Sequence, residues 1–310
     1  MKTASFQSRL IRSVLFPVIA LLLGTLALPA SAQTVTSPGD DGSSGTLRSV
    51  LASAAPGATI HFAPALNGNM ISLTCGSGPI TISQNVTIAG PGANNLAISG
   101  NGPCQILYVN SGVTATISGL TIENGSAAGA PHSPAGQGGG IYNSGTLVID
   151  NCAFLNNSAQ YGGAIAYQFG AVIISGSLFS NNSAQNGGGA VYPGYSYPIT
   201  SIINSTFAGN SALYGGAIAN LSGTLELSFD TFSTNTSNYS AGLFNNNSAT
   251  AILKANLFDD QIGPSCDNEG TEVDEGYNIE DGPTCNFTQT GDQQTLRLPP
   301  QHGRYRRPAE

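Results

Sequence analysis

One short pattern recurs four times along this 310-residue chain, and it constrains the fold more than any other feature. It begins at Phe154 as FLNNSAQYGGAI, and related segments begin at Phe179 (FSNNSAQNGGGAV), Phe207 (FAGNSALYGGAI) and Phe232 (FSTNTSNYSAGLF). Phe258 extends the series, whose steps are 25, 28, 25 and 26 residues. A period of this length is typical of solenoids, in which each unit buries its apolar face only against its neighbours.

The residues before each phenylalanine indicate strands rather than helices. Five positions earlier, every repeat carries an aliphatic residue: Ile149, Ile174, Ile202, Leu227 and Leu253. Seven positions earlier stand Leu147, Val172, Thr200, Leu225 and Ala251, and a spacing of two between the columns is the period of a β-strand. Glycine and β-branched residues also disfavour helical repeats. The pattern therefore predicts an all-β fold, a parallel β-helix of short strands and sharp turns.

Three recurring residue types have structural roles in this prediction. The phenylalanines are expected to stack inside the coil: Phe154, Phe179, Phe207, Phe232 and Phe258. The asparagines are expected to form a ladder in which each amide hydrogen-bonds its copy in the next turn: Asn157, Asn182, Asn210 and Asn235. The paired glycines allow turns where φ is positive or space is short: Gly162 and Gly163, Gly188 and Gly189, Gly215 and Gly216.

Looser copies of the pattern extend the predicted coil toward the N-terminus, as in ITISQNVTIAG from Ile80 and ILYVNSGVTATISGLTIENG from Ile106. Before them, TLRSVLASA has apolar residues at helical spacing and ends at Pro56-Gly57, so we expect an N-terminal capping α-helix over the first turn. The predicted organisation is a cap helix and first strand at residues 47–64 and β-helix repeats at residues 65–262. Together they form a solenoid of roughly 8–9 rungs.

The first residues have the features of an export signal. Lys2, Arg9 and Arg12 precede an apolar run, and Ala30-Ser31-Ala32 supplies the small residues of a cleavage site. We therefore expect a signal peptide at residues 1–32 and a flexible leader at residues 33–46. The protein is expected to be secreted, and to be extracellular or associated with the outer membrane or cell surface. An uncleaved membrane anchor is the alternative, and no later segment is apolar and long enough to span a bilayer.

Charge restricts the class of partner. Without the signal, 6 basic residues stand against 17 acidic ones, a net charge of −11. Such a surface repels nucleic acid and anionic lipid, so neither is expected to bind. The expected partners are cell-surface proteins or glycans, and the chain is expected to be a monomer.

Five cysteines in an exported chain allow two disulfides and one remaining thiol. Cys266 and Cys285 flank an acidic segment and are the preferred pair, Cys75 can pair with Cys104, and Cys152 is expected to pack as a small apolar residue. Residues 263–310 are expected to form an acidic loop and a disordered basic tail. The spacing of the acids at residues 259–281 matches no EF-hand loop, so no cofactor is expected, and calcium at this segment is the alternative.

The sequence gives little support to catalysis. Lyases of this fold need an acid cluster and an arginine or lysine base, and Lys254 is the only lysine or arginine between Arg48 and Arg297. Glu226 and Asp230 are four residues apart, which on one strand separates them by about 13 Å, beyond the roughly 6.5–9.5 Å of inverting glycosidases. We therefore expect solvated acids on a polar face and no catalytic, cofactor-binding or metal-binding residue.

The helix followed by ATIHF, the segment TISGLTIENG, and the alternation of GGAI with F-x-x-N resemble right-handed parallel β-helix proteins with polymorphic outer membrane protein repeats. The resemblance covers residues 45–260. It implies a right-handed coil, export to the bacterial cell surface or outer membrane, and the adhesin or autotransporter-passenger behaviour of several such proteins.

These observations favour an exported, non-catalytic, β-helical surface or extracellular protein that acts as an adhesin-like binding platform. One alternative is a polysaccharide lyase or glycoside hydrolase of the pectate-lyase-like β-helix fold. A second alternative is a purely structural envelope protein.

Overall fold

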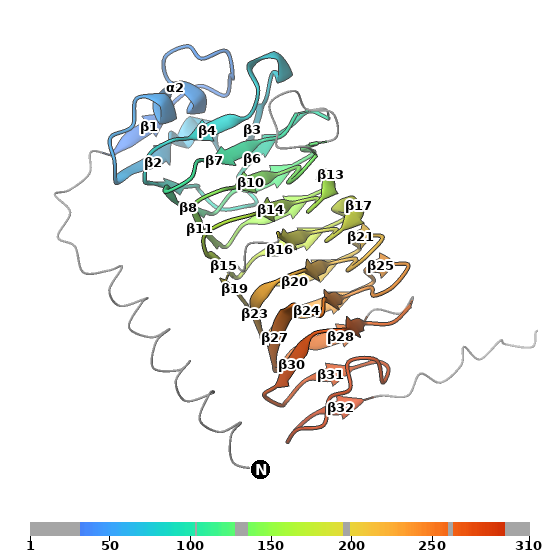
Figure 1. The fold of residues 1–310 in the computed structure, drawn as a ribbon. Coiled ribbons are helices and arrows are strands. Elements are labelled where there is room, and N and C mark those ends of the chain that lie inside the picture. The colour runs from blue at the N-terminus through green and yellow to red at the C-terminus, as the bar shows by residue number, and fades with distance from the viewer. Residues whose placement is uncertain (1–31, 103, 128–135, 195–198, 260–262, 295–310) are drawn as a thin grey trace, which may run out of the picture. The chain divides into compact units, whose positions relative to one another are not determined.

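The computed structural model describes residues 32–102, 104–127, 136–194, 199–259 and 263–294, which form one coil of parallel strands (Figure 1). Each full turn adds one strand to sheets A, B and C, and four turns add a short strand to sheet D. The fold is therefore an all-β parallel β-helix of about nine turns, as the repeat pattern predicted.

The strands are named here in their spatial order within each sheet. Sheet A consists of β1 (Gln33–Val35), β2 (Ala58–Phe62), β5 (Val86–Ala89), β8 (Thr114–Ser118), β11 (Thr146–Asp150), β15 (Val172–Ser175), β19 (Ile199–Ile203), β23 (Gly223–Ser228), β27 (Ala249–Lys254) and β30 (Thr271–Asp274). Sheet B consists of β3 (Asn69–Ser72), β6 (Leu96–Ser99), β9 (Thr121–Glu123), β12 (Ala153–Leu155), β16 (Leu178–Ser180), β20 (Thr206–Ala208), β24 (Thr231–Ser233), β28 (Leu257–Asp259), β31 (Ile279–Glu280) and β32 (Gln293–Gln294). Sheet C consists of β4 (Ile80–Ile82), β7 (Leu107–Val109), β10 (Ile141–Asn143), β14 (Ile165–Tyr167), β18 (Val191–Pro193), β22 (Ile218–Asn220), β26 (Leu243–Asn245) and β29 (Cys266–Asn268). Sheet D consists of β13 (Ser158–Tyr161), β17 (Ser183–Gly187), β21 (Ser211–Ala212) and β25 (Thr236–Ser237).

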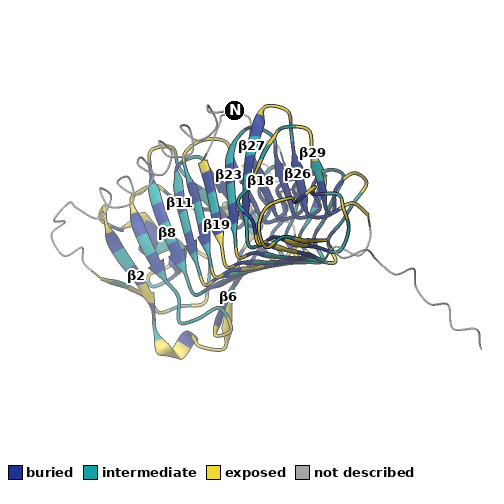
Figure 2. Cartoon of the chain, turned by 90° about the horizontal axis from the view of Figure 1, so that it is seen from below, coloured by how far each residue is buried: buried dark blue, intermediate teal, exposed yellow. Residues whose placement is uncertain are grey.

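Residues at the same position in successive turns stack into columns inside the coil. Figure 2 shows the buried positions alternating with more exposed ones along the strands of sheet A. The five phenylalanines that start the repeats form one inner column, with ring centroids 4.8, 4.8, 5.0 and 4.5 Å apart and nearly parallel planes. Phe287 packs at the end of this column, with its ring centroid 5.9 Å from that of Phe258. Sheet A supplies the aliphatic columns, for example Ile149 opposite Ile174.

The asparagines form a hydrogen-bonded ladder at the corner that follows sheet B. The side-chain Nδ2 and the backbone N–H of Asn182 both donate to Oδ1 of Asn210, at 3.0 Å each. The Nδ2 of Asn182 also donates to the carbonyl oxygen of Phe154, again at 3.0 Å. The same contacts repeat at Asn157 and continue through Asn210 to Asn235. All four side chains are 0% exposed, so the ladder is internal and presents no amide to a ligand.

The glycine pairs shape the turn between sheets D and C. The first glycine of each pair has a positive φ: 61° at Gly162, 63° at Gly188 and 57° at Gly215. The second glycine lacks space, because a Cβ on Gly163, Gly189 or Gly216 would overlap a backbone carbonyl oxygen of the next turn. Each pair thus combines the two reasons for which a chain requires glycine.

The N-terminal end of the coil is covered by α2 (Leu47–Ala52), which packs against β1 and β4. Thr46 caps this helix, since its side chain accepts a hydrogen bond from the backbone N–H of Ser49. The helix is held by Arg48, which donates to Asp40 at 2.8 Å and to the carbonyl oxygens of residues 77–79.

Residues 33–46 differ from the predicted flexible leader. Gln33–Val35 form β1, which pairs with β2, and Asp40 is only 3% exposed. The physical reason is that the first full turn would otherwise leave the edge of β2 unpaired.

Residues 263–294 differ from the predicted acidic loop, because β29, β30, β31 and β32 add strands to three sheets. The structure contains a disulfide between Cys266 and Cys285 at this end and a second one between Cys75 and Cys104 near the other end. Cys152 is a buried free thiol, and burial raises its pKa to about 11.

The predicted signal peptide, apart from its last residue, and the tail from residue 295 onward lie outside the described residues. Within the described ranges, no helix has the length and apolarity needed to cross a bilayer.

Candidate functional site

The outer surface of sheet C carries a column of mainly aromatic residues. The central residues of five of its strands point away from the main core and form a separate apolar cluster, and Tyr108 of the preceding turn packs against this cluster. In successive turns this column contains Tyr108, Tyr142, Ala166, Tyr192, Ala219, Phe244 and Asp267.

A second column runs beside the first, at the ends of the sheet D strands and in the turns that follow them. β-Bridges connect Gln137, Tyr161, Gly187 and Tyr214 in successive turns. Tyr239 continues the column, with its ring stacked on that of Tyr214.

Large and small residues alternate between the two columns over three consecutive turns. Tyr161 shares a turn with Ala166, Gly187 with Tyr192, and Tyr214 with Ala219. Glycine at position 187 leaves room for the neighbouring ring, since a Cβ there would lie 3.1 Å from Cε2 of Tyr192, a tight contact. The two columns therefore interlock into one aromatic strip, which we define as Tyr108, Tyr142, Tyr161, Tyr192, Tyr214, Tyr239 and Phe244.

Ring contacts run along the strip. The centroids of Tyr108 and Tyr142 are 5.6 Å apart, those of Tyr161 and Tyr192 are 4.8 Å apart, and those of Tyr214 and Tyr239 are 4.5 Å apart. The ring of Tyr214 also lies 5.3 Å from that of Phe244 at an angle of 50°.

The strip has a buried floor and an accessible rim. Tyr142, Tyr192 and Phe244 are 3%, 4% and 7% exposed and form the floor. Tyr239 is 47% exposed, and Tyr108, Tyr161 and Tyr214 are half-buried, so these four rings form the surface that a ligand would meet.

The strip offers aromatic faces and neutral hydroxyls. Hydrogen bonding with Tyr239 raises the pKa of Tyr214, and the negative charge of Glu269 acts in the same direction. Burial raises the pKa of Tyr142, whose hydroxyl donates to Oε1 of Gln168 at 3.3 Å. Both hydroxyls therefore stay protonated at neutral pH, and Asp267 and Glu269 give the strip an acidic end.

Sequence reasoning found the repeat but missed this strip. The phenylalanines, asparagines and glycines of the predicted columns lie inside the coil or at its corners, and none of them belongs to the strip. The signal was present as a change within the repeat, since YGGAIA from Tyr161 becomes GGGAVY from Gly187 and YGGAIA again from Tyr214. At each end of this segment, a tyrosine in one turn is replaced by a small residue in the next. This alternation predicts interlocking rings only when the column at the sheet D ends and the column of sheet C are known to lie side by side.

Glu226 lies on the outer face of sheet A. It stands beside Ser201 and Ile252 in the neighbouring turns, as the repeat register indicated. Burial raises its pKa, and the charge of Glu275 acts in the same direction.

Asp230, by contrast, is 0% exposed, so the expectation of a solvated acid is wrong for this residue. Its carboxylate accepts hydrogen bonds from the backbone N–H groups of Ser205 at 2.7 Å and Ser228 at 3.0 Å. Burial raises its pKa to about 7. The residue belongs to an internal polar column at the corner between sheets A and B, which also contains Ser177, Ser205, Asn256 and Asn278.

Three further acids face the interior of the coil at its last turns. Glu272 and Asp274 continue the two aliphatic columns of sheet A, and Glu280 follows Phe258 in the phenylalanine column. Burial raises the pKa of Glu272 to about 7, and the charges of Asp274 and Glu280 add to this effect. These acids are therefore not the solvated group that the sequence suggested.

A hollow of about 280 Å³ lies beside these turns, between residues 263–265 and residues 280–284. Its buried acid, Glu280, is held by the backbone N–H groups of Thr284 at 2.9 Å and Cys285 at 3.0 Å. Acids of the predicted calcium segment are spread over the outside of sheet B at Asp259, the outside of sheet C at Asp267 and the coil interior. In the part of the chain that the structure describes, no group of three or more acid, histidine or cysteine side chains is arranged to hold a metal ion.

The described residues include one arginine and one lysine, and both form ion pairs. Arg48 binds Asp40 at 2.8 Å, and Nζ of Lys254 lies 3.7 Å from Oε2 of Glu275. The outer faces described here therefore carry an excess of negative charge.

No family model matches this chain, and no curated protein matches it. Among solved structures, the chain is similar to a mutant of AlyGC, a PL6 family alginate lyase, with a TM-score of 0.46 and 14% sequence identity. The aligned region covers 87% of this chain and 40% of that chain. This chain thus spans less than half of that lyase, and the similarity is one of fold.

Proposed function

We propose that this protein is an exported, non-catalytic, adhesin-like binding protein whose aromatic strip binds a glycan. The main support for the proposal is the strip, which distributes four accessible tyrosine rings over six turns on one surface of the coil. The face of a sugar ring presents weakly positive C–H groups, which are attracted to the negative face of an aromatic ring. The tyrosine hydroxyls can hydrogen-bond the sugar hydroxyls at the same time.

The dimensions favour a polymer over a single sugar. The strip follows the direction in which the turns stack, from Tyr108 to Tyr239 across six turns. At about 4.8 Å per turn it is about 24 Å long. A linear glycan laid along the strip would contact several rings at once, and the contacts would add without any one of them being strong.

Charge favours a neutral glycan. Asp267 and Glu269 lie at one end of the strip, and the two described cationic side chains are engaged elsewhere in ion pairs. Among the described residues, a polymer of uronic acids would meet carboxylates at this end of the strip with no unpaired cation to balance them, whereas a neutral chain would not be repelled.

The resemblance to proteins with polymorphic outer membrane protein repeats agrees with this proposal, because several of those proteins act at the cell surface as adhesins. Secretion through the signal at residues 1–32 and a place at the cell surface are parts of the same proposal.

Affinity electrophoresis of the purified protein tests the proposal. Gels would contain a neutral polysaccharide (xyloglucan or mannan) or an anionic one (alginate or polygalacturonate). We expect retardation by at least one neutral polymer and none by the anionic polymers. The double variant Tyr214→Ser/Tyr239→Ser should bind at least tenfold more weakly, because it removes two of the four rim rings. Phe169→Ser is the matched control, since Phe169 is 52% exposed but lies outside the strip.

Each contrary result has a clear meaning. Equal retardation of the double variant and the wild type would remove the strip as the binding surface. New reducing ends or unsaturated products in the same mixtures would show a polysaccharide-cleaving enzyme. Absence of saturable binding to any of the polymers or to whole cells would favour a structural envelope protein.

A further inference from the structure

The corner between sheets A and B contains a column of residues in the left-handed backbone conformation. Backbone hydrogen bonds place them in successive turns: Gly119, Asn151, Gly176, Asn204, Phe229, Ala255, Tyr277 and Gly291. Their φ values run from 51° to 86°. The first four positions hold glycine or asparagine, which adopt this conformation most readily. Phe229 and Tyr277 are bulky residues in the same conformation, which is uncommon.

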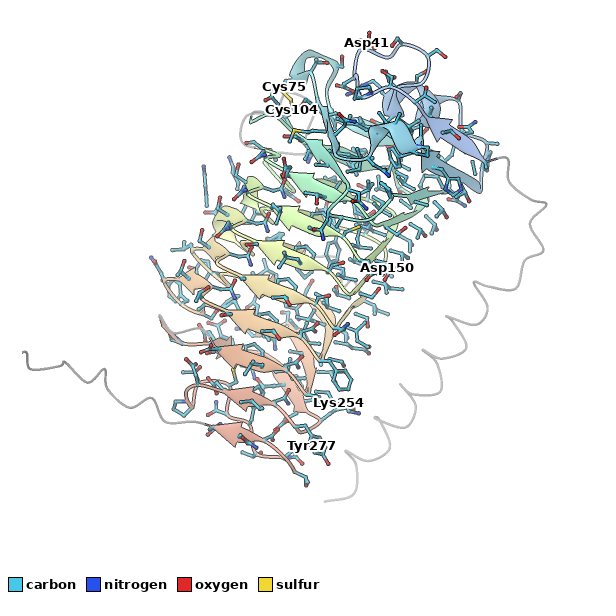
Figure 3. All side chains as sticks on the ribbon, turned by 180° about the vertical axis from the view of Figure 1, so that it is seen from behind. Asp41, Cys75, Cys104, Asp150, Lys254 and Tyr277 are labelled. Atoms are coloured by element: carbon cyan, nitrogen blue, oxygen red, sulfur yellow. A yellow bond between two sulfur atoms is a disulfide. The ribbon has the colours of Figure 1, made fainter. Side chains whose placement is uncertain are left out.

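These two aromatic residues are also exposed. Phe229 is 58% and Tyr277 is 60% exposed, and Ile203 next to them is 42% exposed. Leu257 and Ile279, two residues after Ala255 and Tyr277, extend the apolar surface onto sheet B with exposures of 38% and 36%. We call Ile203, Phe229, Ala255, Tyr277, Leu257 and Ile279 the corner ridge; Figure 3 shows Lys254 and Tyr277 projecting from this edge of the coil.

The coil itself gives no reason for aromatic residues at these positions. Glycine or asparagine would satisfy the turn with less strain, as the earlier turns show. Both rings leave much of their apolar surface in water. Strained backbone together with an exposed apolar surface indicates a contact that the single chain does not contain.

We propose that the corner ridge is the contact surface of a homodimer in which two copies pack with their coils antiparallel about a two-fold axis. Large and small residues alternate along the ridge as Phe229, Ala255, Tyr277 and Gly291, and the ring of Tyr277 lies over Gly291. A two-fold axis reverses this order in the second copy. Phe229 then faces the ring of Tyr277 at the far end of the other ridge, and Ala255 in the middle lets the two backbones approach.

Charge selects a second copy over a membrane surface. Lys254 and Glu275 flank the ridge with opposite signs, 3.7 Å apart, so an antiparallel copy brings Lys254 toward Glu275 of the other chain. A lipid surface offers no such reciprocal pairing, and the acidic chain is repelled by anionic lipid. The ridge is narrow, so the dimer belongs among small, weak interfaces with a Kd on the order of 10 µM. The monomer predicted from the sequence is then the form present in dilute solution.

Sedimentation equilibrium of the purified protein from about 1 to 300 µM tests this proposal, a range that brackets the expected Kd. The wild type should change from monomer to dimer, and Phe229→Asn/Tyr277→Asn should raise the Kd at least tenfold. The double variant should melt at the same or a higher temperature, because asparagine tolerates the left-handed conformation better. Ala255→Arg is a second test that leaves both rings in place but adds bulk and charge at the centre of the contact. Phe169→Ser is the control, and its Kd should equal that of the wild type.

A wild type that stays monomeric throughout this range overturns the proposal, as does a double variant with the wild-type Kd. Flotation with phosphatidylcholine vesicles, run in parallel, tests the alternative that the ridge binds a lipid surface. A monomer that floats with vesicles through Phe229 and Tyr277 would assign the ridge to a lipid surface instead.

Discussion

Asp230 places an ionisable carboxyl where the neighbouring turns have the neutral residues Ser205 and Asn256. The position is completely buried, so ionisation removes a charge from water and raises the pKa from 3.8 to about 7. The folded state therefore holds this proton more tightly than the unfolded chain does. The stability that follows from this difference is fully present below about pH 4 and is lost as the pH rises through 7.

Replacing Asp230 by asparagine should remove this loss. Asparagine continues the column that Asn256 and Asn278 already form, and it carries no charge at any pH. At pH 8 we expect Asp230→Asn to be more stable than the wild type by about 2–4 kcal/mol, and at pH 4 we expect little difference. Urea unfolding at both pH values measures this. Asp150→Asn, at a half-exposed site, is the control and should change stability by less than about 0.5 kcal/mol at either pH. A variant whose stability follows that of the wild type across this range would show that Asp230 is not the titrating group.

The inner columns were predictable from the sequence because their period is strict. Leucine, isoleucine and phenylalanine recur at fixed offsets from each other, and only a strand that returns every 25–28 residues buries all of them together. The register of Ile149 with Ile174 and of Phe154 with Phe179 followed directly. The ends of the coil were not predictable in the same way. β1 and β30 are positioned by pairing with a neighbouring strand, because their own residues do not follow the repeat pattern.

The aromatic strip was less predictable for a related reason. Its residues alternate with small ones from turn to turn, so no single column is constant. Only the three-dimensional adjacency of two columns makes the alternation meaningful. The prediction for Asp230 was wrong because it assumed that the strand of Glu226 continues to residue 230, so that both side chains point outward. The chain instead turns at Phe229, where φ is 60°, and the Asp230 side chain points into the coil.

The asparagine ladder should behave as one element, and a change in its middle tests this. In Asn210→Ala the backbone N–H and Nδ2 of Asn182 lose their shared acceptor, and the carbonyl oxygen of Phe179 loses a donor. These groups are buried, so we expect a loss of about 3–5 kcal/mol in the free energy of unfolding. Asn247→Ala, at an exposed turn, should change it by less than about 0.5 kcal/mol. Denaturant unfolding of both variants measures the difference, and similar small effects in both would show that the ladder adds little stability.

At the scale of the whole molecule, each turn touches only the turns next to it, so local damage should stay local. Breaking the terminal disulfides one at a time tests this. In Cys266→Ser/Cys285→Ser, amide exchange should accelerate in β29, β30 and β31 and remain unchanged from β8 to β19. In Cys75→Ser/Cys104→Ser, the faster exchange should appear around β3, β4 and β6 instead. Hydrogen exchange followed by mass spectrometry of peptides measures both patterns. Uniform acceleration along the chain would instead show that the coil unfolds as a single cooperative unit.

The inward-facing acids of the last turns disfavour the addition of another chain's strands at this end of the coil. A parallel coil has the same strand spacing as an amyloid fibril, and each end of it is a template on which another chain can add strands. In sheet A, an incoming strand over β30 would have to cover the carboxylates of Glu272 and Asp274 instead of aliphatic side chains, whereas in sheet B β32 already lies over Glu280. Propagation is therefore blocked by charge at one end and by a helix at the other. Acidification weakens the block at the charged end, because burial raises the pKa of Glu272 to about 7, whereas the hydrogen bonds that Asp274 accepts lower the pKa of that carboxyl. An acidic environment would thus make the addition of a further strand over β30 less unfavourable.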